Sequence, residues 1–252
     1  MNIVVNGLMT NYLKAGSGRK VVVCLHGWGV DSTNFARLIE KLQAKYTILA
    51  LDLPGFGGSQ EPPGAWGVEN YASFVNAWLK KIGQKEIYAL IGHSNGGAIA
   101  IALLGNGWLK SSKLVLLASG GIRDIYKMRR LFLKSGAKIA KLPIQLLPRR
   151  TRDKVRGRVY KTIGSDLMLL PELEPSYRKI ISQDLQSIAT KIRQPTLIIY
   201  GSGDRTTPVK YGQLFNDAIK GSRLEIIPQA GHFIHQEQAE KVAAMLEEFL
   251  GA

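Results

Sequence analysis

Short apolar runs alternate with longer amphipathic stretches along most of this chain. The apolar runs are five or six residues long and rich in Val, Ile and Leu, which is typical of strands buried on both faces of a sheet. The stretches between them repeat apolar residues at helical spacing. This pattern predicts strands near 21–25, 46–51, 86–91, 113–118, 195–200 and 223–227, and helices near 32–43, 68–81, 95–106, 209–219 and 237–250.

The alternation of strands and helices predicts the α/β class, with a mostly parallel central sheet flanked by helices. Residues 1–12 precede it and predict a hairpin, because two strand-like runs there meet at Asn6-Gly7. Ligands of such sheets bind beyond the carboxyl ends of the strands. Residues that directly follow a predicted strand are therefore the candidates for a functional site.

A serine follows the strand 86–91, within the sequence Gly92-His93-Ser94-Asn95-Gly96. G-x-S-x-G between a strand and a helix requires a tight, strained turn, which lifts the serine hydroxyl above the sheet. The two glycines are required because a Cβ at either position would collide with the neighbouring strand or helix. Ser94 is therefore the candidate nucleophile.

Two later strands are followed by groups that can activate a serine. Asp204 comes after the strand 195–200 in a Gly-rich loop, and His232 comes after the strand 223–227. Serine, then acid, then histidine is the chain order of α/β-hydrolase triads. Two alternatives are that Asp204 only caps the next helix and that His235 is the base instead of His232.

The first strand of the alternating series ends in His26-Gly27-Trp28-Gly29. A Gly-flanked loop at this position lets a backbone N–H point at a developing oxyanion. We expect the N–H groups of Trp28 and Asn95 to form an oxyanion hole. His26 is interpreted as a brace of its loop, and His93 as a residue packed against a neighbouring strand.

Over residues 20–120 and 192–250 the chain resembles serine hydrolases of the α/β-hydrolase fold. It is similar to the carboxylesterase branch that includes pimeloyl carrier-protein methyl ester esterases, and to the meta-cleavage-product hydrolases, which cut C–C bonds. The resemblance implies Ser94 as nucleophile, His232 as base and Asp204 as orienting acid, with no cofactor and no metal. The motifs that carry it are His26-Gly-Trp-Gly29, Asp52-Leu-Pro-Gly-Phe-Gly57, Gly92-His-Ser-Asn-Gly-Gly97, Gly201-Ser-Gly-Asp204 and Gly231-His-Phe233.

The resemblance also implies a domain organisation. Residues 121–191 contain no convincing strand, and in this fold a helical cap is inserted at that position. We expect residues 1–120 and 192–252 to form the α/β-hydrolase core and residues 121–191 to form the cap. Such a cap would roof Ser94, exclude water and shape an apolar acyl pocket.

The positive charge of the chain is concentrated in the predicted cap. Residues 122–165 carry a net charge of +12 out of the formal +15 of the whole chain. Three interpretations compete: a solvated outer face, attraction to an anionic membrane surface, and docking of an acidic partner such as an acyl carrier protein. Nucleic-acid binding is not expected, because the segment lacks interleaved aromatic residues and any recognised nucleic-acid module.

Composition adds two expectations. The single cysteine, Cys24, lies in an apolar strand and is expected to be an inert core residue. Residues 1–12 lack the basic leader and long apolar stretch of a signal peptide, and no window is apolar enough to span a bilayer. The expected localisation is the cytoplasm.

Together these observations predict a serine hydrolase that cleaves carboxylic esters through an acyl-enzyme intermediate. Its substrate would be a small ester with an apolar acyl part. One alternative is a C–C bond hydrolase of the meta-cleavage-product type, for which a cationic group of the cap would bind the substrate carboxylate. Another is a non-catalytic ligand-binding homologue. Acyl length and leaving group depend on cap side chains that the sequence does not place.

Overall fold

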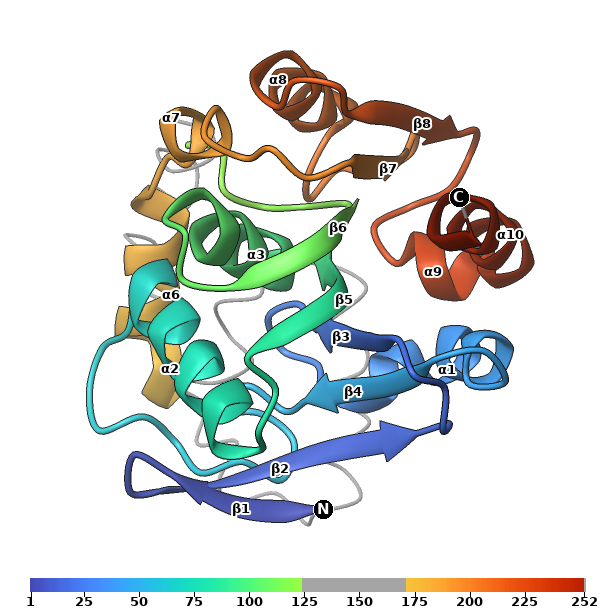
Figure 1. The fold of residues 1–252 in the computed structure, drawn as a ribbon. Coiled ribbons are helices and arrows are strands. Elements are labelled where there is room, and N and C mark those ends of the chain that lie inside the picture. The colour runs from blue at the N-terminus through green and yellow to red at the C-terminus, as the bar shows by residue number, and fades with distance from the viewer. Residues whose placement is uncertain (124–170, 252) are drawn as a thin grey trace, which may run out of the picture.

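The computed structural model describes residues 1–123 and 171–251 of the chain (Figure 1). Within them, one eight-stranded sheet has the order β1-β2-β4-β3-β5-β6-β7-β8. The first two pairings, β1 with β2 and β2 with β4, are antiparallel, and all later ones are parallel. The strands are β1 (Asn2–Val5), β2 (Leu8–Ala15), β3 (Val21–Leu25), β4 (Thr47–Leu51), β5 (Glu86–His93), β6 (Lys110–Leu117), β7 (Thr196–Gly201) and β8 (Arg223–Ile227).

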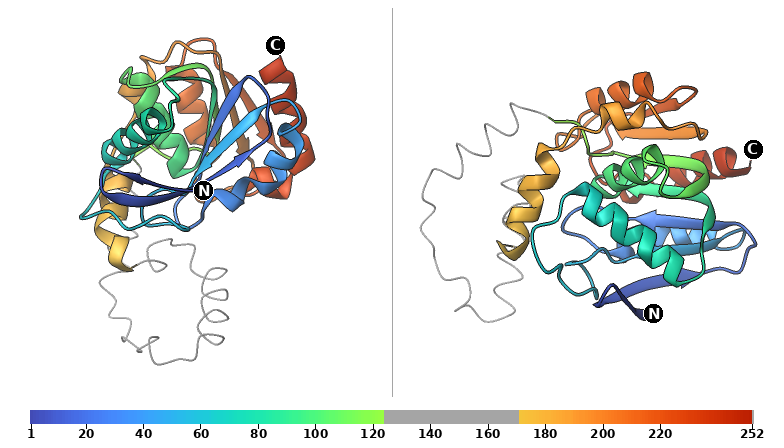
Figure 2. Two further views of the ribbon diagram at one scale, coloured as in Figure 1. Left: turned by 60° about the horizontal axis from the view of Figure 1, so that its bottom comes forward. Right: turned by 60° about the vertical axis from the view of Figure 1, so that its left-hand side comes forward.

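Helices cover both faces of this sheet (Figures 1 and 2). One face carries α1 (Ala36–Leu42) with its preceding 3₁₀ turn η1 (Ser32–Phe35), α9 (Ile234–Glu237) and α10 (Ala239–Gly251). The opposite face carries α2 (Val68–Lys81), α3 (Asn95–Gly105) and α8 (Val209–Ala218). The mostly parallel sheet flanked by helices is therefore confirmed.

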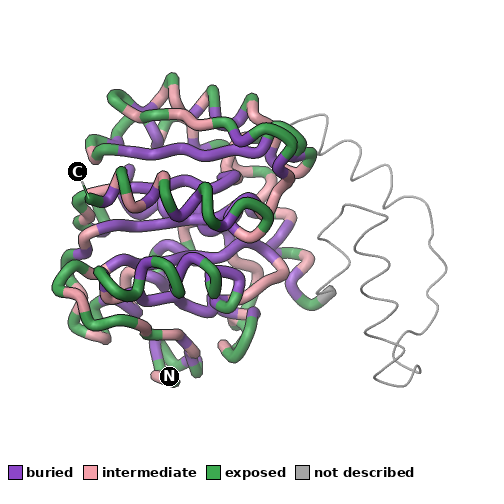
Figure 3. Tube along the Cα trace, turned by 90° about the vertical axis from the view of Figure 1, so that its right-hand side faces the viewer, coloured by how far each residue is buried: buried purple, intermediate pink, exposed green. Residues whose placement is uncertain are grey.

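Alternating strand residues divide between the two helical layers. In β3, Val23 and Leu25 join the core under α2 and α3, whereas Val22 and Cys24 join the core under α1 and α10. All four are at most 2% exposed. The central strands are consequently buried along most of their length (Figure 3). Burial on both faces is the reason that these strands read as continuous apolar runs.

Three of the predicted boundaries differ from the structure by three or more residues. β6 begins at Lys110, ahead of the predicted start at 113, because its polar first residues pair with β5 at the solvent-exposed end of the sheet. The stretch 32–43 begins with the 3₁₀ turn η1 before α1. The last helical stretch begins at Ile234 and is divided into α9 and α10. The opening hairpin is confirmed, and its turn residues Asn6 and Gly7 have φ of 49° and 82°.

The described end of the predicted cap is helical. It contains the 3₁₀ turn η4 (Pro171–Leu173), α6 (Glu174–Ser182) and α7 (Gln186–Ala189). Hydrogen bonds fasten α6 and Gln183 to the start of α2: Trp66 N–H donates to Ser176 Oγ at 2.8 Å, and Val68 N–H donates to Gln183 Oε1 at 2.7 Å.

Residues 124–170 lie outside the described residues, and with them all the basic residues of the segment 122–165 except Arg123. The cap as a domain and its basic surface therefore stay predictions. Across residues 1–123 and 171–251, no helix has both the length and the apolar character needed to cross a lipid bilayer.

Candidate active site

The turn between β5 and α3 places Ser94 at the N-terminus of α3 in an unusual backbone conformation. Its φ of 52° and ψ of −115° lie outside the regions that side-chain-bearing residues prefer. A Cβ on Gly92 would lie 2.5 Å from the carbonyl O of Gly96, and a Cβ on Gly96 would lie 2.0 Å from that of Leu25. The predicted need for glycine at both positions is confirmed.

Ser94, His232 and Asp204 lie in one hydrogen-bonded chain. The Ser94 Oγ is 3.0 Å from His232 Nε2, and His232 Nδ1 is 2.8 Å from Asp204 Oδ2. Because an ionised carboxylate only accepts, His232 carries its proton on Nδ1 and leaves Nε2 free to accept the serine proton. The structure therefore brings together three side chains that come from the ends of β5, β7 and β8.

The surroundings of Asp204 keep its carboxylate ionised. Burial raises the pKa of this carboxyl, but hydrogen bonds from His232 and Thr207 outweigh it and hold the pKa below the ordinary value. The donors are His232 Nδ1–H, the Thr207 hydroxyl at 2.7 Å, and the N–H groups of Thr206 and Thr207 at 2.7 and 3.0 Å. Asp204 therefore both organises its own loop and contacts the imidazole.

The loop after β3 lies directly against Ser94. A Cβ on Gly27 would be only 3.1 Å from Ser94 Cβ. His26 fixes this loop: its Nε2 accepts from the Leu53 N–H at 2.9 Å, and its Nδ1 is 2.7 Å from the Gly27 carbonyl O. The interpretation of His26 as a brace is confirmed. Asp52, the carboxylate that follows β4, accepts from the N–H groups of Ser32 and Gly58 and does not contact His232 among the described hydrogen bonds.

Asn95 follows Ser94 and Trp28 follows Gly27, and both residues have unused hydrogen-bond donors. Among the hydrogen bonds within residues 1–123 and 171–251, none uses the backbone N–H of either residue. Their side chains are 8% and 5% exposed, and Trp28 Nε1 and both polar side-chain atoms of Asn95 are buried without a partner. The Trp28 ring packs on Phe56 and Tyr177, with centroids 5.0 and 5.1 Å away.

Two further histidines lie close to His232. The His93 ring is tilted against the rings of His232 and His235, and its Nε2 is 3.0 Å from the His232 carbonyl O. The ring also lies close to Gly27, directly after the neighbouring strand β3, because a Cβ on Gly27 would be 3.0 Å from His93 Nδ1. His235, the rival base, is fully buried and directs its Nε2 to Asn34 Oδ1. Burial lowers the pKa of His235 to about 3. His232 is thus the histidine that contacts Ser94.

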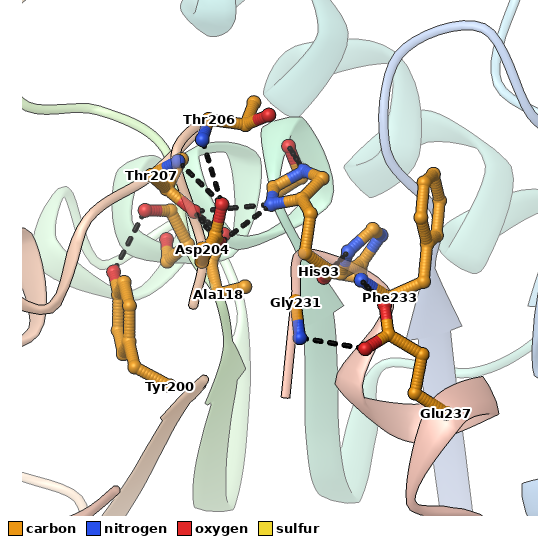
Figure 4. Close-up of polar contacts among 12 residues, drawn as sticks. His93, Ala118, Tyr200, Asp204, Thr206, Thr207, Gly231, Phe233 and Glu237 are labelled. Carbon is orange, nitrogen blue, oxygen red and sulfur yellow. Dashed lines mark hydrogen bonds and ion pairs between the residues drawn. The ribbon is translucent and has the colours of Figure 1, made fainter. Parts of the chain in front are cut away.

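Sequence reasoning missed two residues that surround this chain of contacts (Figure 4). The Thr207 hydroxyl contacts Asp204, and the Glu237 carboxylate accepts from the N–H groups of Gly231 and Phe233, on either side of His232. A signal for Glu237 was present, because an acidic residue one turn into a helix often accepts from its first N–H groups. No comparable local pattern marked Thr207.

The described side chains offer no metal centre, since no group of three or more His, Cys, Asp and Glu within those residues is placed to hold an ion. Cys24 is buried, and burial raises the pKa of its thiol to about 12. It therefore adds no nucleophile to the site.

A largely parallel sheet with Ser, Asp and His, in that chain order, at the ends of three of its strands defines the class of α/β hydrolases. The chain belongs to the alpha/beta hydrolase family, whose family model matches residues 22–245.

Individual relatives are distant. A pimeloyl-[acyl-carrier protein] methyl ester esterase of Neisseria meningitidis is 29% identical over 251 residues, which cover 92% of this chain and 93% of the relative. Among solved structures, a bacterial membrane phospholipase A has a TM-score of 0.82 at 25% identity and covers all of this chain and 85% of its own. A meta-cleavage product hydrolase of Pseudomonas fluorescens IP01 has a TM-score of 0.75, with 100% and 97% covered; its 21% identity shows a shared fold alone.

Proposed function

We propose that this protein is a serine hydrolase that cleaves carboxylic esters through an acyl-enzyme intermediate. The observation that carries the proposal is the Ser94–His232–Asp204 chain, with contacts of 3.0 and 2.8 Å, in a member of the alpha/beta hydrolase family. Ser94 is half-buried, whereas the residues on either side of it, His93 and Asn95, are buried.

The reaction follows from the hydrogen-bond roles. The Ser94 oxygen attacks the ester carbonyl carbon while His232 Nε2 takes the serine proton, and the electron pair of the C=O bond moves to oxygen. Asp204 stabilises the resulting imidazolium. When the tetrahedral intermediate collapses, the imidazolium gives its proton to the departing alcohol. Water then attacks the acyl-enzyme by the same route and releases the acid and free Ser94.

The N–H groups of Trp28 and Asn95 would bind the oxyanion of both tetrahedral intermediates. Two observations support this assignment. Gly27 lies so close to Ser94 that a Cβ there would come within 3.1 Å of Ser94 Cβ, and neither N–H group has a protein acceptor among the described residues. Donors that are held in place before the reaction stabilise the transition state without reorganisation. Removing one such donor typically costs about 3–4 kcal/mol.

The proposed substrate is a small ester with an apolar acyl part. The aromatic rings of Trp28, Phe56 and Tyr177 form a buried apolar cluster next to the loop that contacts Ser94. The pimeloyl-[acyl-carrier protein] methyl ester esterase among the relatives supports an ester, and a carrier-bound one is one form that the substrate could take. Recruitment of an acidic carrier or an anionic membrane by the basic residues of 122–165 stays a prediction.

Substitution of the serine tests the proposal. Aryl esters of graded acyl length would be assayed with the native protein, with Ser94→Ala and with Ser187→Ala, which removes an exposed hydroxyl on α7. We expect Ser94→Ala to lower kcat by about 10⁴- to 10⁶-fold and to abolish labelling by a fluorophosphonate probe. Ser187→Ala should retain both. Ester hydrolysis that survives unchanged in Ser94→Ala would refute the proposal.

A further inference from the structure

We propose that Glu237 is a positioning residue that holds the backbone of His232 in register with Ser94 and Asp204. This inference rests on the proposed function, because it assumes that His232 is the base. It assigns to an exposed carboxylate on α9 a role in the reaction, although that carboxylate contacts neither Ser94 nor Asp204 among the described contacts.

The carboxylate of Glu237 lies beside the backbone of Gly231 and Phe233 (Figure 4). Its Oε2 accepts from the Gly231 N–H at 2.6 Å, and its Oε1 accepts from the Phe233 N–H at 3.2 Å. These two N–H groups belong to the residues immediately before and after His232. A Cβ on Gly231 would come within 2.9 Å of Glu237 Oε1, so glycine permits this close approach.

The chemistry of these contacts favours a rigid loop. Phe233 is the residue that precedes α9, and its N–H is one of those that the short helix leaves without an intrahelical acceptor. An ionised carboxylate is a stronger acceptor than a neutral oxygen. Within the described part of the chain, no lysine or arginine forms an ion pair with Glu237. Its described hydrogen-bond donors are the two N–H groups.

The third contact comes from the other side of the loop. His93 Nε2 is 3.0 Å from the His232 carbonyl O, and since a carbonyl only accepts, this nitrogen carries the proton. Burial, with the neighbouring His235 and His232, holds the pKa of His93 well below its usual value, so the ring is neutral. Because His93 immediately precedes Ser94, this bond ties the His232 backbone to the chain that carries the serine.

Fixing the backbone matters because the imidazole must make two contacts at once. Its ring nitrogens reach Ser94 and Asp204 at 3.0 and 2.8 Å, and a rotation or shift of the main chain that improves one contact lengthens the other. A misplacement of about 1 Å in a reacting group can cost about 100-fold in rate. Loosening this loop should therefore slow the proton transfer without weakening substrate binding.

The experiment compares Glu237→Ala and Glu237→Gln with Glu240→Ala. Glu240 is a matched control, because it is an exposed acid on α10 whose partner is Lys41 at 3.0 Å, away from the loop of His232. The kcat for an aryl ester would be expressed per active site titrated with a fluorophosphonate, and the KM and the melting temperature would be measured in parallel. Ser94→Ala would be assayed alongside.

For Glu237→Ala we expect kcat per active site to fall about 10- to 100-fold, with KM changed less than about twofold. Glu237→Gln should restore part of the rate, because its amide oxygen still accepts one of the two N–H groups. Glu240→Ala should match the native protein. Melting temperatures should stay within about 4 °C, as expected for exposed contacts in a chain of this size.

Two results would overturn the inference. One is a kcat per active site that is unchanged in Glu237→Ala. This holds even if the melting temperature or the titratable fraction falls, because such a fall alone is a purely structural effect. The other is an equal loss in Glu240→Ala. If Ser94→Ala keeps full activity, the proposed function fails and the inference fails with it. Loss in Ser94→Ala with native kcat in Glu237→Ala overturns this inference alone.

Discussion

Ser94 occupies a backbone conformation that costs about 1–3 kcal/mol for a residue with a side chain. The surrounding structure sustains this cost because α3 and β3 pack closely around the turn. The closest approach is at Gly96, where the backbone of β3 leaves no room for a Cβ. Gly96 and the strained Ser94 therefore belong to the same turn, which places the serine hydroxyl at the N-terminus of α3.

We expect Gly96→Ala to destabilise the protein by about 2–3 kcal/mol or more, because its Cβ would meet the carbonyl O of Leu25 at 2.0 Å and β3 would have to shift. Gly64→Ala is the control: a Cβ there meets nothing within 4 Å, so the change should stay within about 0.5 kcal/mol. Urea denaturation measures both. Equal stability of the two variants would show that the turn tolerates a side chain.

At the scale of elements, the strands were the most predictable part of this chain. Runs such as 195–200 are buried on both faces, so composition alone indicated β7. The start of β6 was not predictable, because Lys110 and Ser111 pair with β5 but lie at the solvent-exposed end of these two strands. Burial determines how much of a strand its sequence reveals.

The candidate site was predictable to the extent that its residues follow strands directly. Ser94, Asp204 and His232 could be placed at strand ends, and the parallel sheet then brings these ends together. The role of His93 was not predictable, because its partner is a backbone carbonyl 139 residues away. A long-range contact to a main-chain atom leaves no signature in residue types, whereas the local contacts of Glu237 with the N–H groups at the start of α9 did leave one.

The position of Cys24 in β3 leads to a prediction about reactivity. Its strand lies between β4 and β5, its side chain is 2% exposed, and burial raises the pKa of the thiol to about 12. We expect iodoacetamide at pH 8 to leave the folded protein unmodified and to alkylate it fully in urea, since the thiolate is the nucleophile. Mass spectrometry distinguishes the two states. Stoichiometric labelling of the folded protein would contradict the packing of this strand.

At the scale of the whole molecule, three histidines are buried in a neutral form. His26, His93 and His235 belong to three separate segments, and for each the pKa is lowered, chiefly by burial. Each also forms a hydrogen bond to another segment: His26 to the loop after β4, His93 to the loop after β8, and His235 to η1. The protonation of these rings is therefore coupled to the folding of the entire sheet.

This coupling predicts acid lability. The pKa of His235 is about 3 in the folded protein against an ordinary value of 6.5, so between these values the unfolded chain binds more protons. Stability is therefore complete above pH 6.5 and falls as the pH drops toward 3, by up to about 1.4 kcal/mol per pH unit for each such histidine. Carboxylates whose pKa is lowered in the folded protein, such as Asp52 with its ordinary value of 3.8, also lose their contribution to stability, but only as the pH falls through and below that value.

Urea denaturation at several pH values between 7.5 and 4.5 measures the effect. His235→Gln should show a shallower pH dependence than the native protein, because one buried titrating ring is removed while an amide remains to contact Asn34. The stability of this variant at pH 7.5 sets the baseline. A free energy of unfolding that stays constant over this pH range would show that the buried rings take up protons in the folded protein at the same pH as in the unfolded chain.

The Ser94 and His232 side chains that touch in the folded protein are 138 residues apart in the chain. A ribosome translating this message has therefore released the serine turn long before it polymerises the histidine. A nascent polypeptide that ends before β8 carries the Ser94 hydroxyl without the imidazole that it contacts in the folded protein. The proposed activity is therefore acquired only after His232 has been synthesised.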